Sequence, residues 1–182
     1  MVTAITGGIA EGKSTILDFL SGLGYRTLSA DSVARDLFNE PAVNRLLAEV
    51  AELPLPLTPR ELQQAIAARP QIRRFVNRIM HPRVLERLGD DKAEFVEVPL
   101  LIETCLQSRF DQVWVATCGL DEQRRRLIAR YGLSFDWNAM MASQLPTVAK
   151  FPFADEVFRT NCPVETVRQN VSEALARRFE CG

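Results

Sequence analysis

Eight residues near the start of the chain form a pattern that binds phosphate groups. The pattern GxxxxGK[ST] matches Gly7-Gly8-Ile9-Ala10-Glu11-Gly12-Lys13-Ser14, and Thr15 follows it. Glycines let the backbone N–H groups wrap closely around phosphate oxygens, and a following helix adds its positive N-terminal end. Lys13 would place its charge against the β- and γ-phosphates, and the Ser14 hydroxyl would be a ligand of Mg²⁺. The motif, a P-loop, therefore predicts a nucleoside triphosphate site at residues 8–15.

Transfer of a phosphoryl group to a hydroxyl requires a carboxylate that orients or deprotonates that hydroxyl. Asp31 directly follows a strand-like run over residues 26–30. It would therefore lie at the carboxyl edge of the sheet, where ligands bind in open α/β sheets. It could instead cap the N-terminus of a helix that begins near Ser32. The residues alone favour a general base and a helix cap about equally.

Arginines later in the chain offer a second group of candidates. Gln123, Arg126 and Arg130 are spaced to share one face of a helix predicted over residues 121–131. Acidic residues at 121 and 122 stand four positions before arginines, so a solvated face of ion pairs is the default interpretation. The alternative is a lid whose arginines reach the phosphates. The single histidine, His81, precedes Pro82 and by itself favours a structural role.

The elements that must position these residues alternate along the chain. Apolar, β-branched runs predict strands over 2–6, 26–30, 94–98, 112–117 and 156–160. Helical spacing predicts helices over 13–23, 32–38, 42–50, 59–68, 70–80, 121–131, 137–144 and 164–179. This order predicts one α/β domain, with a parallel sheet covered by helices on both faces. The helix-rich stretch over 32–88 would form a substrate-side subdomain.

Composition narrows the range of partners. The formal net charge of −1 gives no basic field of the kind that binds nucleic acid, and no apolar run reaches membrane-spanning length. No signal-peptide pattern precedes the first strand. The four cysteines are scattered and form no CxxC pair, which favours reduced thiols in a cytoplasm. We therefore expect a cytoplasmic protein that acts on small molecules, with no nucleic-acid or membrane partner; no oligomeric state follows from the sequence.

Several segments together resemble the dephospho-CoA kinase family. The resemblance runs from Thr6 to about Asn161 and depends on the order and spacing of the segments. They are TGGIAEGKST at the P-loop, LSADSVAR at 28–35, MHPRV at 80–84, VPLLIE at 98–103, QRRRLIAR at 123–130, and the spaced residues Gln144, Lys150, Ala154, Asp155 and Asn161.

The resemblance implies a three-layer P-loop kinase fold with a five-stranded parallel sheet, a helical acceptor subdomain and a lid over about 130–150. It implies transfer of the γ-phosphate of ATP to the ribose 3′-hydroxyl of dephospho-CoA, giving coenzyme A and ADP. Asp31 would be the base, Lys13 and Ser14 would bind phosphate and Mg²⁺, and Arg126 and Arg130 would be lid arginines. Three residues would line the acceptor side and one would lie near the adenine of ATP: His81, Leu100 and Glu103, and Asn161.

This chain also departs from the family pattern. Ser29 stands where the family usually has an aspartate, Tyr131 where an aspartate is common and Met140 where an arginine is frequent. Glu11 replaces a small residue and is expected to bring negative charge close to the phosphates, unless its side chain turns to solvent. Two alternatives therefore stay open: another small-molecule or nucleotide kinase on this scaffold, or a catalytically weak nucleotide-binding protein.

Overall fold

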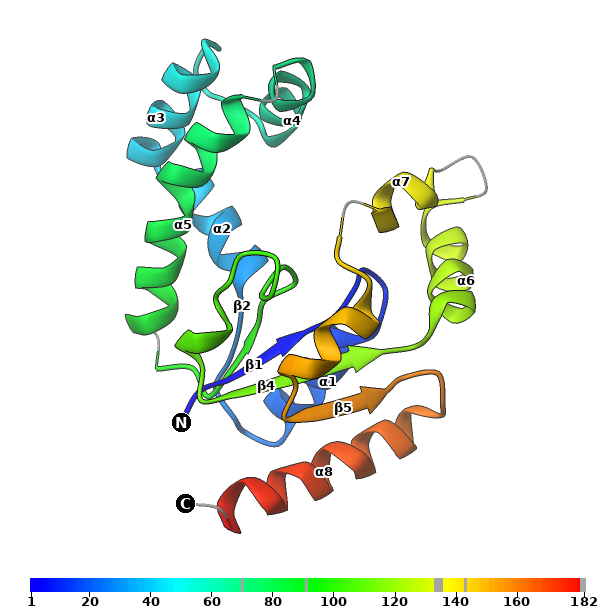
Figure 1. The fold of residues 1–182 in the computed structure, drawn as a ribbon. Helices are drawn as coiled ribbons and strands as arrows, with labels where there is room; N and C mark the ends of the chain where they lie inside the picture. Colours follow the sequence, from blue (N-terminus) through cyan, green and yellow to red (C-terminus); the bar gives the residue numbers. More distant parts are fainter. Residues whose placement is uncertain (70, 91, 133–135, 143, 181–182) are drawn as a thin grey trace. The chain divides into compact units, whose positions relative to one another are not determined.

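The computed structural model describes residues 1–69, 71–90, 92–132, 136–142 and 144–180, in which one or more helices separate successive strands (Figure 1). The strands are β1 (Thr3–Thr6), β2 (Thr27–Ser29), β3 (Phe95–Glu97), β4 (Gln112–Thr117) and β5 (Glu156–Arg159). The helices are α1 (Lys13–Gly22), α2 (Ala30–Asn39), α3 (Pro41–Ala51), α4 (Pro59–Ala68), α5 (Ile72–Asp90), α6 (Leu120–Tyr131), α7 (Trp137–Ala142) and α8 (Val164–Glu180), with the 3₁₀ helices η1 (Gln107–Arg109) and η2 (Thr147–Phe153). The chain forms two compact units, one from residues 1–27 and 93–182 and the other from residues 28–92.

One five-stranded sheet runs in the order β2-β3-β1-β4-β5. Strand β1 pairs in parallel with β3 and β4, and β4 pairs in parallel with β5. Thr3 lies opposite Phe95 on one side and Gln112 on the other, so β1 is the central strand. Because β1 ends at Thr6, the P-loop that follows lies at the carboxyl end of this strand. The predicted α/β fold with a five-stranded parallel sheet is confirmed.

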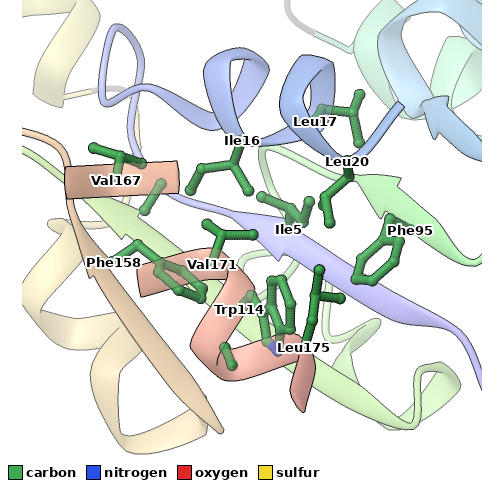
Figure 2. Close-up of a cluster of buried hydrophobic side chains, with 12 residues drawn as sticks. Ile5, Ile16, Leu17, Leu20, Phe95, Trp114, Phe158, Val167, Val171 and Leu175 are labelled. Atoms are coloured by element: carbon green, nitrogen blue, oxygen red, sulfur yellow. The ribbon is translucent and has the colours of Figure 1, made fainter. Parts of the chain in front are cut away.

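One face of the sheet packs against α1 and α8. Figure 2 shows the strand residues Ile5, Phe95, Trp114 and Phe158 pointing into one apolar cluster with residues from both helices. The rings of Phe95, Trp114 and Phe158 follow one another across three strands at centroid distances of 5.2 and 5.0 Å. Because side chains alternate along each strand, these residues all point to the same face of the sheet. Their packing holds β1, the strand that leads into the P-loop, in place.

The opposite face of the sheet carries smaller side chains. Val96, Val113 and Val115 are buried there, and η2 contacts β4. Leu101 and Ile102, in the turn that follows β3, are buried as well. None of the helices in the described ranges is long and apolar enough to cross a lipid bilayer.

The second unit is built from helices α2 to α5. Their buried face includes Phe38, Leu47 and Ile72. Helix α4 begins at a capping box, in which Thr58 accepts a hydrogen bond from Glu61 N–H and Glu61 accepts one from Thr58 N–H. This unit covers the stretch predicted as a substrate-side subdomain, whose role in acceptor binding stays a prediction.

Helix α5 corrects one sequence prediction, because it does not stop before His81. It continues through Pro82 to Asp90 as a single helix. Proline lacks a backbone N–H, so one hydrogen bond of the helix is missing at Pro82. Next to it, the guanidinium of Arg83 donates to the carbonyl of Ile79 at 2.7 Å. Helix α5 also contacts α2 and α3, and this packing outweighs the local preference of the helix to end.

Candidate functional site

The P-loop conformation requires glycine at two of its fixed positions. Gly7 has φ of 147°, and a Cβ atom there would collide with the carbonyl oxygen of Ala116. Gly12 has φ of 88°, and its Cβ would lie 2.9 Å from Thr160 Oγ1. L-residues rarely adopt these angles, so the sequence motif matches a real steric requirement of the loop.

Lys13 and Ser14 begin helix α1, directly after the loop. Lys13 is only 7% exposed, and its Nζ donates to the carbonyl oxygen of Gly8 at 2.8 Å. The Ser14 and Thr15 side chains are exposed in the first turn of α1. The loop therefore presents a cation and two hydroxyls at the positive end of a helix.

These groups fit a magnesium ion that is held mainly by nucleotide. Among residues 1–69, 71–90, 92–132, 136–142 and 144–180, no three His, Cys, Asp or Glu side chains gather as a metal cage. Mg²⁺ in nucleotide sites commonly takes one or two protein oxygens and completes its shell with phosphates and water. The exposed Ser14 hydroxyl suits that arrangement.

Side chains from distant segments fix the backbone of the loop. The N–H of Ile9 donates to Gln144 Oε1 at 3.0 Å, and Gln123 Nε2 donates to the carbonyl of Ile9 at 2.9 Å. Arg126 donates to the carbonyl of Ala10 at 3.2 Å, and the Thr160 hydroxyl donates to the carbonyl of Glu11 at 2.8 Å. Helix α6, the segment after α7 and the end of β5 therefore all hold the P-loop.

The Glu11 side chain does not turn to solvent, which was one of the two orientations considered from the sequence. It is only 2% exposed and turns inward. The carboxylate accepts hydrogen bonds from the N–H of Gly8 at 2.5 Å, from the Thr117 hydroxyl at 3.2 Å and from the Thr147 hydroxyl. Each of its oxygens has at least one donor, so the charge is stabilised within the protein. Glu11 therefore stabilises the conformation of the loop through these hydrogen bonds.

The two arginines on the predicted helix face, Arg126 and Arg130, lie in different surroundings. Arg126 pairs with Glu122 at 2.7 Å and also reaches Thr160 as well as the P-loop. Glu122 pairs with Arg125 too, at 2.6 Å, and hydrogen bonds from Arg126 and Arg125 lower the pKa of Glu122. Arg130 is exposed, with its guanidinium carbon 5.3 Å from the ring centre of Tyr131. The ion-pair interpretation thus applies at Glu122, but Arg126 also contacts the phosphate-binding loop.

Glu103, predicted from the resemblance to line the acceptor side, forms a buried ion pair. Its carboxylate lies 2.9 Å from Lys150 Nζ, and the Lys150 side chain is 0% exposed. It also accepts from the N–H of Leu145 at 2.9 Å. Burial raises the pKa of Glu103, but hydrogen bonds from Lys150 and backbone N–H groups, with the charge of Lys150, outweigh burial and lower it overall. Glu103 therefore anchors residues 144–150, here called the return segment, to the turn after β3.

Glu103→Gln should destabilise the protein by about 3–5 kcal/mol at neutral pH, because it leaves Lys150 charged and buried without its partner. A lowered pKa means that the contribution of Glu103 is complete above its ordinary value of 4.5 and is lost as the pH falls through the folded value. The difference between wild type and variant in urea unfolding should therefore shrink below about pH 4.5.

The more exposed pair of Glu156 with Arg177, at 2.8 Å, supplies a control. Glu156→Gln should cost less than about 1 kcal/mol, as surface pairs do. Equal losses for Glu103→Gln and Glu156→Gln would contradict the anchoring role of the buried pair.

Asp31 lies in the other compact unit, in the first turn of α2. The helix begins at Ala30 and its N-cap position is Ser29, so the alternative of Asp31 as the N-cap is wrong. The Asp31 side chain is exposed. His81 is also exposed, on α5 of the same unit. Both side chains are therefore accessible to a ligand.

Asn161 and Leu100 follow the carboxyl ends of two strands, in the unit of residues 1–27 and 93–182. Asn161 follows β5 and lines a hollow of about 420 Å³ together with residues 118–122 and 125. Leu100 follows β3 and is 41% exposed. Burial raises the pKa of the Cys118 thiol in this hollow to about 11, so it stays protonated and is no nucleophile at neutral pH.

Sequence reasoning missed four side chains that hold the P-loop: Thr117, Gln123 as a loop ligand, Thr147 and Thr160. Gln144 had been noted only for its spacing. The Gln123 position on the arginine face was an available signal. The threonines carry none, because their contacts with the loop span more than a hundred residues of sequence.

Comparison with known proteins decides the family of this site. The family model for dephospho-CoA kinase matches residues 1–165. This chain belongs to the dephospho-CoA kinase family. A dephospho-CoA kinase from Streptococcus mutans is 34% identical over 196 residues, which cover 97% of this chain and 96% of that protein. The resemblance seen in the sequence is confirmed.

Solved structures share the fold of this chain. The crystal structure of TT1252 from Thermus thermophilus superposes with a TM-score of 0.81 at 28% identity, over 97% of both chains. A dephospho-CoA kinase from Campylobacter jejuni gives a TM-score of 0.70 at 23% identity, over 96% of this chain and 95% of that one. The second likeness supports the fold alone. The P-loop kinase fold predicted for this chain, with its five-stranded parallel sheet, is therefore confirmed.

Proposed function

We propose that the protein transfers the γ-phosphate of ATP to the ribose 3′-hydroxyl of dephospho-CoA, producing coenzyme A and ADP. The observation that carries this proposal is the P-loop of a dephospho-CoA kinase family member, with Lys13 held against the loop carbonyl of Gly8. ATP and dephospho-CoA are the two substrates. Location in the cytoplasm stays a prediction from the scattered cysteines.

The roles of individual residues follow from their positions and chemistry. Lys13 and the loop N–H groups bind the β- and γ-phosphates, and Ser14 supplies an oxygen to Mg²⁺. When bound, Mg²⁺ neutralises charge on the phosphate oxygens. Asp31 accepts the proton of the acceptor hydroxyl, and Arg126 and Arg130 stabilise charge on the transferring group.

The acceptor side is proposed to include His81, Leu100 and Glu103, with Asn161 near the adenine. Leu100 and His81 are exposed and free to contact a ligand. Glu103 would act there indirectly, since its carboxylate is engaged by Lys150 and Leu145. We therefore expect Glu103 to position the turn that carries Leu100.

An acceptor panel tests the proposed activity against its alternatives. ADP release is measured with ATP and dephospho-CoA, and in parallel with nucleoside monophosphates and small alcohols. The proposal predicts that ADP is released rapidly from ATP only when dephospho-CoA is the acceptor. Release only with another acceptor would indicate a different kinase, and ATP binding without release for any acceptor would indicate a nucleotide-binding protein.

The lid predicted over residues 130–150 is proposed to be restricted to the part before the return segment. Residues 133–135 and 143 of that range lie outside the described residues. Met141 of α7, Leu120, and Val148 of the return segment line a cavity of about 330 Å³, so Met141 is not packed against other side chains on that side. The return segment, in contrast, is held by Glu103 and Glu11.

Amide exchange should separate these two parts of the predicted lid. The N–H groups of Gln144, Leu145 and Ala149 are hydrogen-bonded, so they should exchange slowly even in the free protein. A non-hydrolysable ATP analogue with dephospho-CoA should add protection mainly in α7 and at the end of α6. Peptides from α8 serve as the internal control. Protection confined to the P-loop, with α7 already slow in the free protein, would rule out the lid.

A further inference from the structure

Gly8 connects the return segment to the catalytic lysine. Its carbonyl oxygen accepts from Lys13 Nζ at 2.8 Å. Its N–H donates to Glu11 Oε2 at 2.5 Å and to Thr147 Oγ1 at 3.2 Å. The residue that restrains Lys13 is therefore itself held by a carboxylate and by a hydroxyl from far along the chain.

The packing around Gly8 is as close as its hydrogen bonding. A Cβ atom there would lie 2.7 Å from Gln123 Nε2, 2.8 Å from Glu11 Oε2 and 3.0 Å from Thr147 Oγ1. Three polar side chains thus close around the glycine from different segments. Such a fit leaves the Gly8 peptide groups little freedom to rotate.

The hydrogen-bond directions in this cluster make Glu11 and Thr147 interdependent. A carboxylate only accepts, so the Thr147 hydroxyl donates to Glu11 and its oxygen accepts from Gly8. Thr117 supplies a further donor to the other Glu11 oxygen. Loss of the Thr147 hydroxyl would remove a donor from a buried charge and an acceptor from Gly8 at once.

We propose that Glu11 and Thr147 are positioning residues that set the orientation of Lys13 by fixing Gly8. The pair joins the return segment to the P-loop, so the phosphate-binding loop and the base of the lid behave as one unit. This inference rests on the proposed role of Lys13 in binding the β- and γ-phosphates. It gives Glu11, a departure from the family pattern, a supporting role in nucleotide binding.

Thr147→Val tests the inference, because valine keeps the shape and removes the hydroxyl. Titration with a fluorescent, non-hydrolysable ATP analogue should show affinity lower by about 10-fold, the scale of one hydrogen bond to a charged group. Thr147→Ser should restore affinity to within about 2-fold. Thr117→Val, which loses a donor that does not reach Gly8, should have a smaller effect, and the exposed Thr166→Val on α8 is the matched control.

A double-variant comparison separates positioning of Lys13 from general support of the fold. In a Lys13→Ala background no ammonium remains to be positioned, so adding Thr147→Val should change affinity by less than about 2-fold. An equal loss in both backgrounds would overturn the inference in favour of a purely structural role. No loss in the wild-type background would overturn it as well.

A second variant keeps the test decisive if Thr147→Val fails to fold. Glu11→Gln keeps the size of the side chain and removes its charge, and the same two backgrounds apply with the same expected outcomes. The titration uses no acceptor. A protein inactive on dephospho-CoA would therefore refute the proposed function, whereas the dependence on Lys13 would still decide the role of Glu11 and Thr147.

Discussion

Lys13→Ala should reduce phosphoryl transfer to dephospho-CoA by about 10³-fold or more, while the protein stays folded. The ammonium of Lys13 is the cation that the motif directs at the β- and γ-phosphates, where negative charge is concentrated. Its contact with Gly8 lies within the loop, and Lys13 is not a member of the apolar core cluster. The variant therefore removes charge from the site without removing core packing.

Two further lysine variants sharpen the Lys13 experiment. Lys92→Ala alters an exposed lysine and should leave turnover unchanged. Lys13→Arg keeps the positive charge but replaces a compact ammonium with a planar fork, so it should recover little activity. Circular dichroism and thermal melting establish that each variant is folded. Near-full activity of Lys13→Ala at saturating Mg-ATP would contradict the assignment of the P-loop.

Asp31→Asn should lower kcat by about 10²-fold or more and leave ATP affinity nearly unchanged. Asparagine matches the size of aspartate but cannot take the proton of the acceptor hydroxyl. Asp31 is exposed in the first turn of α2 and is not the cap of that helix. Its loss should therefore affect the chemical step and not the stability of the unit.

Asp36→Asn gives the matched control, because Asp36 is another exposed aspartate on α2. Its kcat should equal that of the wild type. Steady-state kinetics and a separate ATP titration distinguish a lost base from a lost ligand. If Asp31→Asn mainly weakens ATP binding, then Asp31 contacts the nucleotide or its metal, and another group must accept the proton.

Much of the fold was predictable because local patterns and tertiary packing agree. Predicted strand 112–117 coincides with β4, since its apolar residues 113–116 suit a strand buried in a parallel sheet. Gly7 and Gly12 were identifiable because their backbone angles exclude other residues. Periodicity failed at Pro82, where packing of α5 on its neighbours outweighs the local cost of a proline.

The bracing of the site could not be predicted in the same way. Glu11 accepts from Thr117 and Thr147, which are more than a hundred residues away in sequence. Nothing in the local pattern tells a carboxylate that faces phosphate from one that is buried among hydroxyl donors. The sequence alone therefore predicts that its charge weakens ATP binding, whereas the hydrogen bonds around the buried carboxylate show that it stabilises the loop.

Phosphorus NMR of a reaction containing the purified protein, Mg-ATP and dephospho-CoA shows whether the protein phosphorylates the ribose 3′-hydroxyl. We expect ADP signals and a new phosphomonoester signal coupled to the ribose 3′ proton, in equal amounts, with none formed by Lys13→Ala. Intact dephospho-CoA after prolonged incubation, or a phosphoryl group attached at another position, would contradict the proposed function.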